Sequence, residues 1–369
     1  MRASALARVA EVQVKNAHQK EAGVTTARIA CEIAQNVDTP AETANLLAGI
    51  VVPIFVEAEK IEEAKFVYDR AFELAQKISK NQERQRSQSL GLIAEAQARL
   101  GEFDVALRTL EAIPIPYFHV DALRSITQLQ LEADPQQIEK CKIALNKADE
   151  YYKSADPLSF EFLNMLKALT IIAVARSTIG ETQAALATFA AILEAAQTKE
   201  QRERDKDFSI IAIGYAEIGD FPTAIKIINE IKDGTQQLNA LWTIAWEQFK
   251  KGEQVTTLDI ALAAKEKIED EQKRLEALKS IAQIQAIAGK GEEALRTLEA
   301  MLNDRNTHLR DIALLFAETG DRVNFKRLLI PCAYYLDTAY EMCEYLARLY
   351  PEQASAVVTV LSELNEGEQ

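Results

Sequence analysis

The residue types that could perform chemistry are scattered along this sequence. The three histidines, His18, His119 and His308, each fall near an expected connection between helices, with no carboxylate or cysteine at catalytic or metal-ligand spacing. The cysteines form no Cys-x-x-Cys pair and no cluster with histidine, and they are Cys31, Cys141, Cys332 and Cys343. We therefore expect no catalytic residues, no metal site and no cofactor.

Two further patterns resemble active-site chemistry but have a structural explanation. The acid pairs Glu62-Glu63 and Glu292-Glu293 fall in the first turn of expected helices, where negative charge is favoured by the helix dipole. The stretch Gly289-Lys290-Gly291 lacks both the Gly-Lys-Ser/Thr sequence and the preceding strand of a phosphate-binding loop. Neither pattern indicates an enzyme.

Charge and hydropathy exclude several classes of partner. The 369 residues include 42 basic and 56 acidic ones, so the net charge is −14, whereas nucleic-acid binding requires clustered Lys and Arg. The longest apolar run, 46–56, has 11 residues and contains Pro53, while spanning a bilayer takes about 20. Arg2 and Arg8 interrupt the N-terminus where a signal peptide would be apolar. We expect a cytoplasmic protein that binds neither nucleic acid nor membrane.

The composition predicts an all-α protein. The chain has only 13 Gly and 9 Pro, about half of their typical shares of roughly 7% and 5%. Alanine, by contrast, makes up about 15% of the chain, and it favours helices that pack closely. A β-sandwich or barrel is not expected, because its tight hairpins need many turn residues.

A repeated pattern gives these helices an order. In six places an Ile-Ala pair is followed by a glycine eight residues after the isoleucine. The copies are Ile93-Ala94 with Gly101, Ile172-Ala173 with Gly180, Ile211-Ala212 with Gly219, Ile244-Ala245 with Gly252, Ile281-Ala282 with Gly289, and Ile312-Ala313 with Gly320. An apolar residue three positions before each isoleucine extends the stripe, and apolar residues resume at helical spacing after the glycine. Each copy therefore predicts a helix, a glycine turn and a second helix packed on the first.

Weaker copies extend the pattern to nearly the whole chain. Their expected turns lie at Ala17, Glu59, Asp134-Pro135 and Tyr350-Pro351. A hairpin that is apolar on one side must stack on its neighbours, so we expect about ten stacked helix-turn-helix units in an α-α superhelix, or solenoid. We expect one domain over 1–369, with degenerate first hairpins in 1–80 and a C-terminal capping hairpin in 334–366. The oligomeric state stays open, because end hairpins expose apolar sides unless they are capped.

The pattern resembles the tetratricopeptide repeat (TPR), a helical hairpin of about 34 residues. The spacing of that family's signature is matched best in 208–228, by Phe208, Ile211, Ala212, Tyr215, Gly219, Phe221, Ala224 and Ile228. The proline that usually closes a repeat is missing, with Phe118 and Gln236 at its expected places, which suggests longer, uneven second helices. The resemblance implies a right-handed superhelix whose first helices line a concave, partner-binding face.

Candidate binding residues follow from the resemblance. Its concave face is formed by positions ten and six residues before the turn glycine, here Ser209 and Ile213, Trp242 and Trp246, and Lys279 and Gln283. Phe249 continues the tryptophan surface, and Lys206, Asn239 and Lys279 flank it. Exposed aromatic patches often mark recognition sites, and the alternative is that both indoles fill space between repeats. Some family members clamp a C-terminal carboxylate with Lys and Asn, which Lys279 with Gln283 matches only in part.

Three functions are compatible with this pattern. The first is a non-enzymatic scaffold or adaptor that binds a peptide or helix of a partner protein in the concave groove. The second is the ligand-sensing regulatory module of a signalling system, in which a ligand tightens or loosens the superhelix. The third is an α-solenoid enzyme such as a lyase, for which the sequence offers no convergent acid, Cys or His cluster. We favour the scaffold.

Overall fold

The computed structural model is all-helical, as the composition predicts. It describes residues 2–16, 18–34, 39–133, 139–154, 162–301, 305–333 and 336–363. No β-strand occurs in these ranges. The chain divides into two compact units, of which unit 1 comprises Met1–Ala148 and Tyr335–Gln369 and unit 2 comprises Asp149–Tyr334. A single domain over 1–369 stays a prediction.

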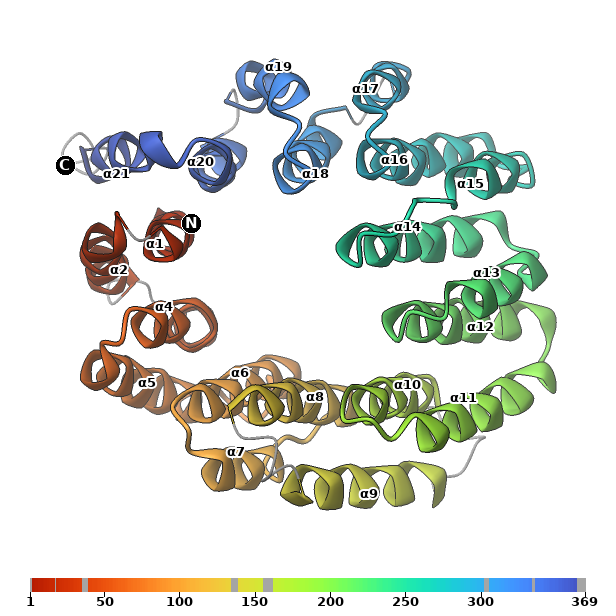
Figure 1. Cartoon of the computed structure of the whole chain (residues 1–369), viewed down its shortest axis with the longest axis horizontal. Coiled ribbons are helices and arrows are strands. Elements are labelled where there is room, and N and C mark those ends of the chain that lie inside the picture. Colours follow the sequence, from red (N-terminus) through yellow and green to blue (C-terminus); the bar gives the residue numbers. More distant parts are fainter. Residues whose placement is uncertain are drawn as a thin grey trace. The chain divides into compact units, whose positions relative to one another are not determined.

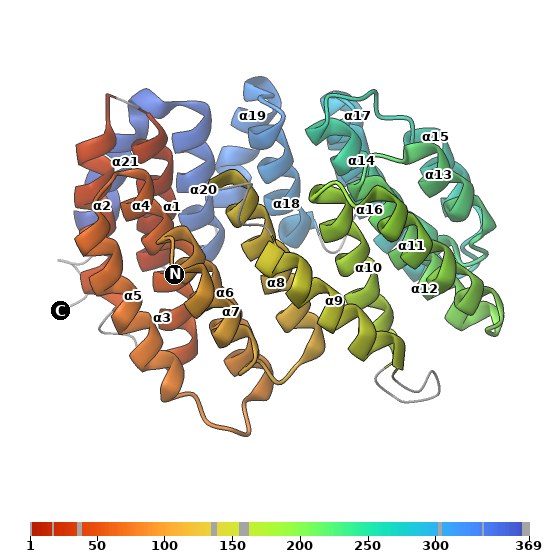
Figure 2. The ribbon, with the colours of Figure 1, turned by 60° about the horizontal axis from the view of Figure 1, so that its bottom comes forward.

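Helices follow one another through both units, with short connections (Figures 1 and 2). The helices of unit 1 are α1 (Arg2–Lys15), α2 (Lys20–Ala34), α3 (Pro40–Leu46), η1 (Leu47–Val51), α4 (Val52–Glu57), α5 (Ile61–Gln76), α6 (Glu83–Arg99), α7 (Phe103–Leu110), α8 (Pro116–Ala133), α20 (Leu336–Leu349), η3 (Pro351–Gln353) and α21 (Ala354–Glu363). The unit boundary falls within α9 (Glu139–Ser154). The helices of unit 2 are α10 (Phe162–Thr178), α11 (Thr182–Gln197), α12 (Gln201–Glu217), α13 (Phe221–Glu230), α14 (Gly234–Lys250), α15 (Leu258–Lys265), α16 (Glu271–Ile287), α17 (Gly291–Glu299), α18 (Arg305–Glu318) and α19 (Arg322–Ala333).

All six repeat glycines end a helix in the left-handed backbone region. Their φ angles lie between 71° and 88°, a region that L-residues with a side chain adopt only at a cost. In the clearest copy, Gly219 N–H donates to Ala216 O and Asp220 N–H to Tyr215 O, both at 2.9 Å. This pair of bonds is the Schellman motif, and it satisfies the last carbonyls of α12 before the chain reverses.

Glu59 takes the same turn without glycine. Its φ is 61°, its N–H donates to Val56 O at 2.9 Å, and Lys60 N–H donates to Phe55 O at 2.8 Å. The turn of this weaker copy of the repeat therefore lies at the residue that the sequence pattern predicts. Tyr350 is different, because its φ is −133° and a short 3-10 turn follows. The expected turns at Ala17 and Asp134-Pro135 lie outside the described residues.

The Ile-Ala pairs form the buried stripe that the pattern predicts. All twelve side chains of the six pairs are at most 2% exposed. Alanine at these contacts lets neighbouring helices approach closely, which is why it is so frequent. One member of the extended stripe departs from the prediction: Leu278 is only half-buried, while its neighbour Ala277 is 5% exposed.

Within unit 2, the helices pack as successive hairpins. Each of the first helices α10, α12, α14 and α16 contacts the next first helix along the chain, and each contacts its own second helix. Figure 1 shows α11, α13, α15, α17 and α19 along one side of that row. The expectation of longer second helices is wrong for most repeats, because α13 has 10 residues and α15 has 8 against 17 in α12, α14 and α16.

Within unit 1, helices from the two ends of the chain pack together. Helix α1 contacts α2, α20 and α21 (Figure 2). Arg2 Nε donates to Leu361 O at 2.6 Å, and Arg8 forms an ion pair with the buried Glu344 at 3.4 Å. Leu6 and Val9 are fully buried in the shared core. The apolar side of the first helix is therefore covered by the last helices of the same chain.

The helical run Pro40–Glu57 contains a wider turn. Residues 47–51 are π-helical and end two positions before Pro53, and Val52 N–H donates to Leu47 O. Proline lacks an N–H and clashes with the preceding turn, and a π turn accommodates this. By length and hydropathy the run is also the one candidate membrane span among the described residues, with 44% of it buried inside the protein. Core helices of globular proteins meet the same criterion.

The turn conformation predicts opposite effects for two exchanges. Gly219→Ala forces a side chain into the left-handed region, so we expect the free energy of unfolding to fall by about 1 kcal/mol. Glu59→Gly relieves the same penalty and is expected to raise it by about 0.5 kcal/mol. Urea denaturation followed by circular dichroism at 222 nm measures both. An equal loss in the two variants would contradict the assigned turns.

Candidate functional site

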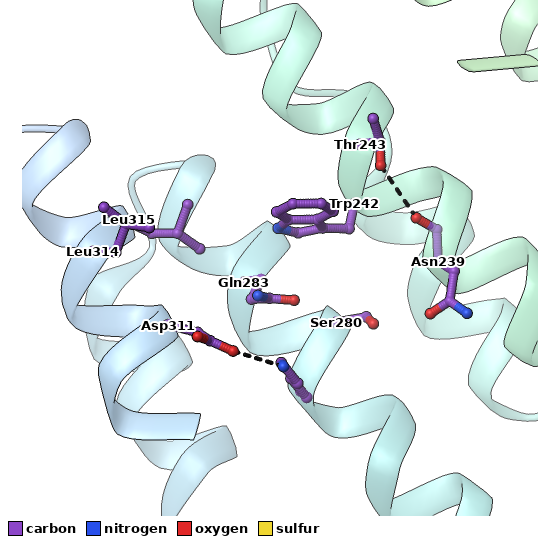
Figure 3. A pocket seen from close by; sticks show the side chains of 9 residues that line it. Asn239, Trp242, Thr243, Ser280, Gln283, Asp311, Leu314 and Leu315 are labelled. Atoms are coloured by element: carbon purple, nitrogen blue, oxygen red, sulfur yellow. Dashed lines mark hydrogen bonds and ion pairs between the residues drawn. The ribbon is translucent and has the colours of Figure 1, made fainter. Parts of the chain in front are cut away.

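Four of the nine residues predicted to bind a partner meet at a pocket in unit 2. It has a volume of about 530 Å³ and is formed by three successive first helices, α14, α16 and α18 (Figure 3). Its lining residues are Asn239, Trp242, Thr243, Lys279, Ser280, Gln283, Asp311, Leu314 and Leu315. On each helix they recur at a spacing of three or four, which places them on one face. The indole of Trp242 lies opposite Leu314 and Leu315, with the polar side chains between and beside them.

A buried aspartate fixes the start of the helix that carries Trp242. Asp205, on α12, is 2% exposed, and its carboxylate accepts hydrogen bonds from the backbone N–H groups of Lys232 at 3.2 Å and of Asp233 at 2.9 Å. Asp233 is itself the N-cap of α14 and accepts from Thr235 N–H at 2.8 Å. Free N–H groups at a helix start need such acceptors. The position of α14 is thus tied directly to α12.

The first turn of α14 is also closely packed against neighbouring hairpins. A Cβ at Gly234 would lie 2.5 Å from Ala264 O, so only glycine fits there. Gln237 is 1% exposed, donates to Ile228 O at 3.1 Å and accepts from Lys267 Nζ at 2.9 Å. These contacts to the preceding and following hairpins hold the helix axis, and with it the indole, in place.

An ion pair joins the two charged side chains that line the pocket, and Asp311 also pairs with Arg310 beside it at 3.3 Å. Lys279 Nζ lies 2.6 Å from Asp311 Oδ2, and Figure 3 shows this bond between α16 and α18. Both side chains are only partly exposed, at 35% and 22%. A lysine already compensated at this distance is a poor clamp for a partner's terminal carboxylate. The partial match of Lys279 and Gln283 to a carboxylate clamp is therefore not supported by the geometry.

Two polar groups at the pocket have no hydrogen-bond partner. The side chain of Gln283 is 9% exposed and makes no hydrogen bond to any residue that the structure describes. The indole N–H of Trp242 is buried, also without an acceptor. A buried polar group without a partner costs about 1–3 kcal/mol, which applies to the indole N–H of Trp242, while the amide of Gln283 is open to a ligand that supplies hydrogen-bonding groups.

The other predicted residues lie outside this pocket. Trp246 and Phe249 are half-buried and stack on each other, with ring centroids 5.4 Å apart. On α12, Ser209 is 8% exposed, Ile213 is half-buried, and Lys206 faces Glu203 at 3.9 Å. The pocket thus unites four of the nine predicted residues, Asn239, Trp242, Lys279 and Gln283.

Five lining residues were missed from the sequence. Leu314 stands six residues before Gly320, so the rule applied to earlier repeats would have found it in the last one. Thr243, Ser280 and Asp311 each stand nine residues before a turn glycine, and the first two are next to the predicted positions Trp242 and Lys279. Their repeated offset is a signal that one extra position per repeat faces the pocket.

Metal and thiol sites depend on how the His, Cys, Asp and Glu side chains in the described part of the chain are placed. No group of three or more His, Cys, Asp or Glu in the described ranges could hold a metal ion. Burial raises the pKa of the Cys31 thiol to about 12 and that of Cys332 to about 11. These thiols stay protonated at neutral pH, and the thiolate is the nucleophilic form.

Comparisons with known proteins leave the family open. No family model and no curated protein matches the chain. Among solved structures it is similar to Ton1535 from Thermococcus onnurineus NA1, with 15% sequence identity and a TM-score of 0.30, over 87% of this chain and 94% of that one. A likeness at this level adds nothing to the fold or to the function.

The half-buried tryptophans give an optical test of the pocket. We expect acrylamide to quench part of the fluorescence of the native protein. We also expect it to quench the fluorescence of the Trp242→Phe and Trp246→Phe variants, each of which retains one indole. The urea-unfolded protein gives the fully accessible reference. Native fluorescence that acrylamide leaves unchanged would show that both indoles are buried and that no ligand can reach them.

The buried aspartate that holds α14 gives a stability test. Asp205→Ala leaves two backbone N–H groups without their acceptor, so we expect the free energy of unfolding to fall by about 2 kcal/mol. Glu276→Ala removes an exposed carboxylate from α16 and is the matched control, with an expected change below about 0.5 kcal/mol. Equal stability of the two variants would contradict this role of Asp205.

Proposed function

We propose that the protein is a non-enzymatic scaffold, acting in the cytoplasm, that binds a peptide segment of another protein. In this proposal the hairpins form a TPR-like α-α superhelix, and the first helices of unit 2 provide its concave surface. The proposal rests on one observation: three successive first helices contribute equivalent positions to one pocket that contains Trp242.

The repeat geometry suits an extended ligand. The position nine residues before the turn glycine lines the pocket on all three first helices, and the positions ten and six before it each do so on two, so polar and apolar side chains recur along the row of helices. Stacked hairpins generally use such a continuous surface for binding. A ligand that crosses α14, α16 and α18 meets one similar set of positions per helix.

The chemistry of the pocket favours a neutral, partly apolar segment. The indole face and the leucines Leu314 and Leu315 offer an apolar anchor site, and Trp side chains dominate many interfaces. The amide of Gln283 and the side chain of Asn239 can pair with the N–H and C=O groups of a peptide backbone. Because Asp311 compensates Lys279, the pocket adds no strong preference for a charged partner.

A peptide-display selection tests this function. Peptides enriched on the immobilised wild-type protein are synthesised with a fluorophore, and their dissociation constants are measured by fluorescence anisotropy. Trp242→Ala and Gln283→Ala are each expected to weaken binding at least tenfold, which corresponds to about 1.4 kcal/mol.

The control shortens an exposed apolar side chain that lies away from the pocket. Leu262→Ala, on α15, alters a leucine that is 42% exposed and is expected to leave binding unchanged. Circular dichroism verifies that each variant keeps its helicity. Enriched peptides that bind Trp242→Ala as tightly as the wild type would refute the pocket, and a selection without enrichment would refute peptide binding.

A further inference from the structure

A second hollow lies in unit 1, separate from the pocket around Trp242. It has a volume of about 530 Å³ and is lined by α5, α6 and α7. The lining residues are Tyr68, Phe72, Ala75, Gln76, Arg86, Leu90, Gln97, Val105, Arg108, Thr109 and Ala112. Along α6 the lining extends from Arg86 to Gln97, a rise of about 16 Å at 1.5 Å per residue. We call this hollow the arginine groove.

Two arginines give the groove a positive lining, and the carboxylates that act on Arg108 and Tyr68, namely Asp104, Glu102 and Asp69, lie outside that lining. Neither Arg86 nor Arg108 has an ion pair or a side-chain hydrogen bond with any residue in the described ranges, and no acidic residue lines the groove. Asp104, one turn before Arg108, is already paired with Lys140 at 2.5 Å. Guanidinium groups stay charged at all physiological pH values and bind carboxylates through paired N–H donors. In a chain of net charge −14, the groove is thus a local cationic site.

The groove also has an apolar wall. The rings of Tyr68 and Phe72 lie nearly parallel, with centroids 6.3 Å apart. Leu90 and Val105 complete this wall from the neighbouring helices. An inorganic anion gains nothing from such a surface, whereas a segment with both acidic and aliphatic side chains uses the charges and the wall together.

A buried amide identifies the ligand more narrowly. Gln97 is 2% exposed, and its side chain bonds to one described residue, Tyr68, whose Oη accepts from Nε2 at 2.8 Å. Its other polar atom, Oε1, is buried without a partner. Either orientation of the amide leaves one of the two atoms unpaired, because Tyr68 contacts only one of them. A polypeptide can satisfy this amide, since its backbone supplies both donors and acceptors.

We propose that the arginine groove binds a short acidic peptide segment of a partner protein, with carboxylates on Arg86 and Arg108 and aliphatic side chains against Tyr68 and Phe72. An extended segment of about five residues covers the length of the groove at roughly 3.3 Å per residue. The site differs from the pocket around Trp242 in place and in charge. The test of this site is therefore independent of the test of the proposed function.

The test uses a short fluorescein-labelled peptide with two leucines and two glutamates in a Gly/Ser background, and its counterpart with glutamines. Fluorescence anisotropy measures binding to the full chain at low salt. We expect Arg86→Gln with Arg108→Gln to weaken binding of the glutamate peptide at least tenfold. The glutamine peptide is expected to bind the wild type at least tenfold more weakly than the glutamate peptide, a comparison that needs no variant.

The matched control changes two arginines of the same helix that lie outside the groove. Arg84→Gln with Arg99→Gln removes the same charge from α6 and is expected to change binding less than twofold. An equal loss in both double variants would show a diffuse charge effect and overturn the groove. Trp242→Ala is expected to bind the peptide as the wild type does, which separates this result from the test of the pocket.

Binding of other anionic ligands in place of the peptide would contradict the proposal. Phosphatidylserine vesicles or inorganic phosphate that bind through Arg86 and Arg108, while the glutamate peptide does not bind, would overturn the proposal. Equal binding of the glutamate and glutamine peptides would do the same.

Discussion

The structure depends on one constraint: a helical hairpin that is apolar on one side cannot bury that side alone. The Ile-Ala pairs, at most 2% exposed, are the contacts that meet it, because alanine allows close approach and isoleucine fills the space beside it. The turn glycines at positive φ reverse the chain so that each pair faces the next hairpin. In unit 1 the same constraint is met at the chain ends, where α20 and α21 cover α1.

Much of the helical order was predictable from the sequence, since it follows from local rules. The Gly turns follow from backbone sterics, and even Glu59 was located by its spacing alone. The lengths of the second helices could not be predicted, because the distance between turn glycines does not show how much of each connection is loop. Five residues, 253–257, lie between Gly252 and the start of α15 at Leu258. Packing between distant segments, such as Arg2 on Leu361, leaves no local pattern.

The candidate site, too, could be predicted from the sequence only in part. Trp242, Lys279 and Gln283 could be placed on one surface because the resemblance to the TPR assigns their offsets from the turn glycine to one face of the first helices. The pairing of Lys279 with Asp311 could not be predicted, since the lateral offset between α16 and α18 depends on how the hairpins stack. That pairing changes the chemistry of the pocket, from a carboxylate clamp to a largely neutral, apolar anchor site. The arginine groove was missed because its residues come from three helices with no common motif.

The most direct measurement of the central claim is the indole N–H spectrum of the ¹⁵N-labelled protein during titration with a peptide enriched by selection. Trp242→Phe and Trp246→Phe assign the two indole resonances. Binding at the pocket moves the Trp242 resonance saturably, because its N–H lacks an acceptor in the free protein. A peptide that binds with both indole resonances unmoved would contradict a binding site built on the first helices of unit 2.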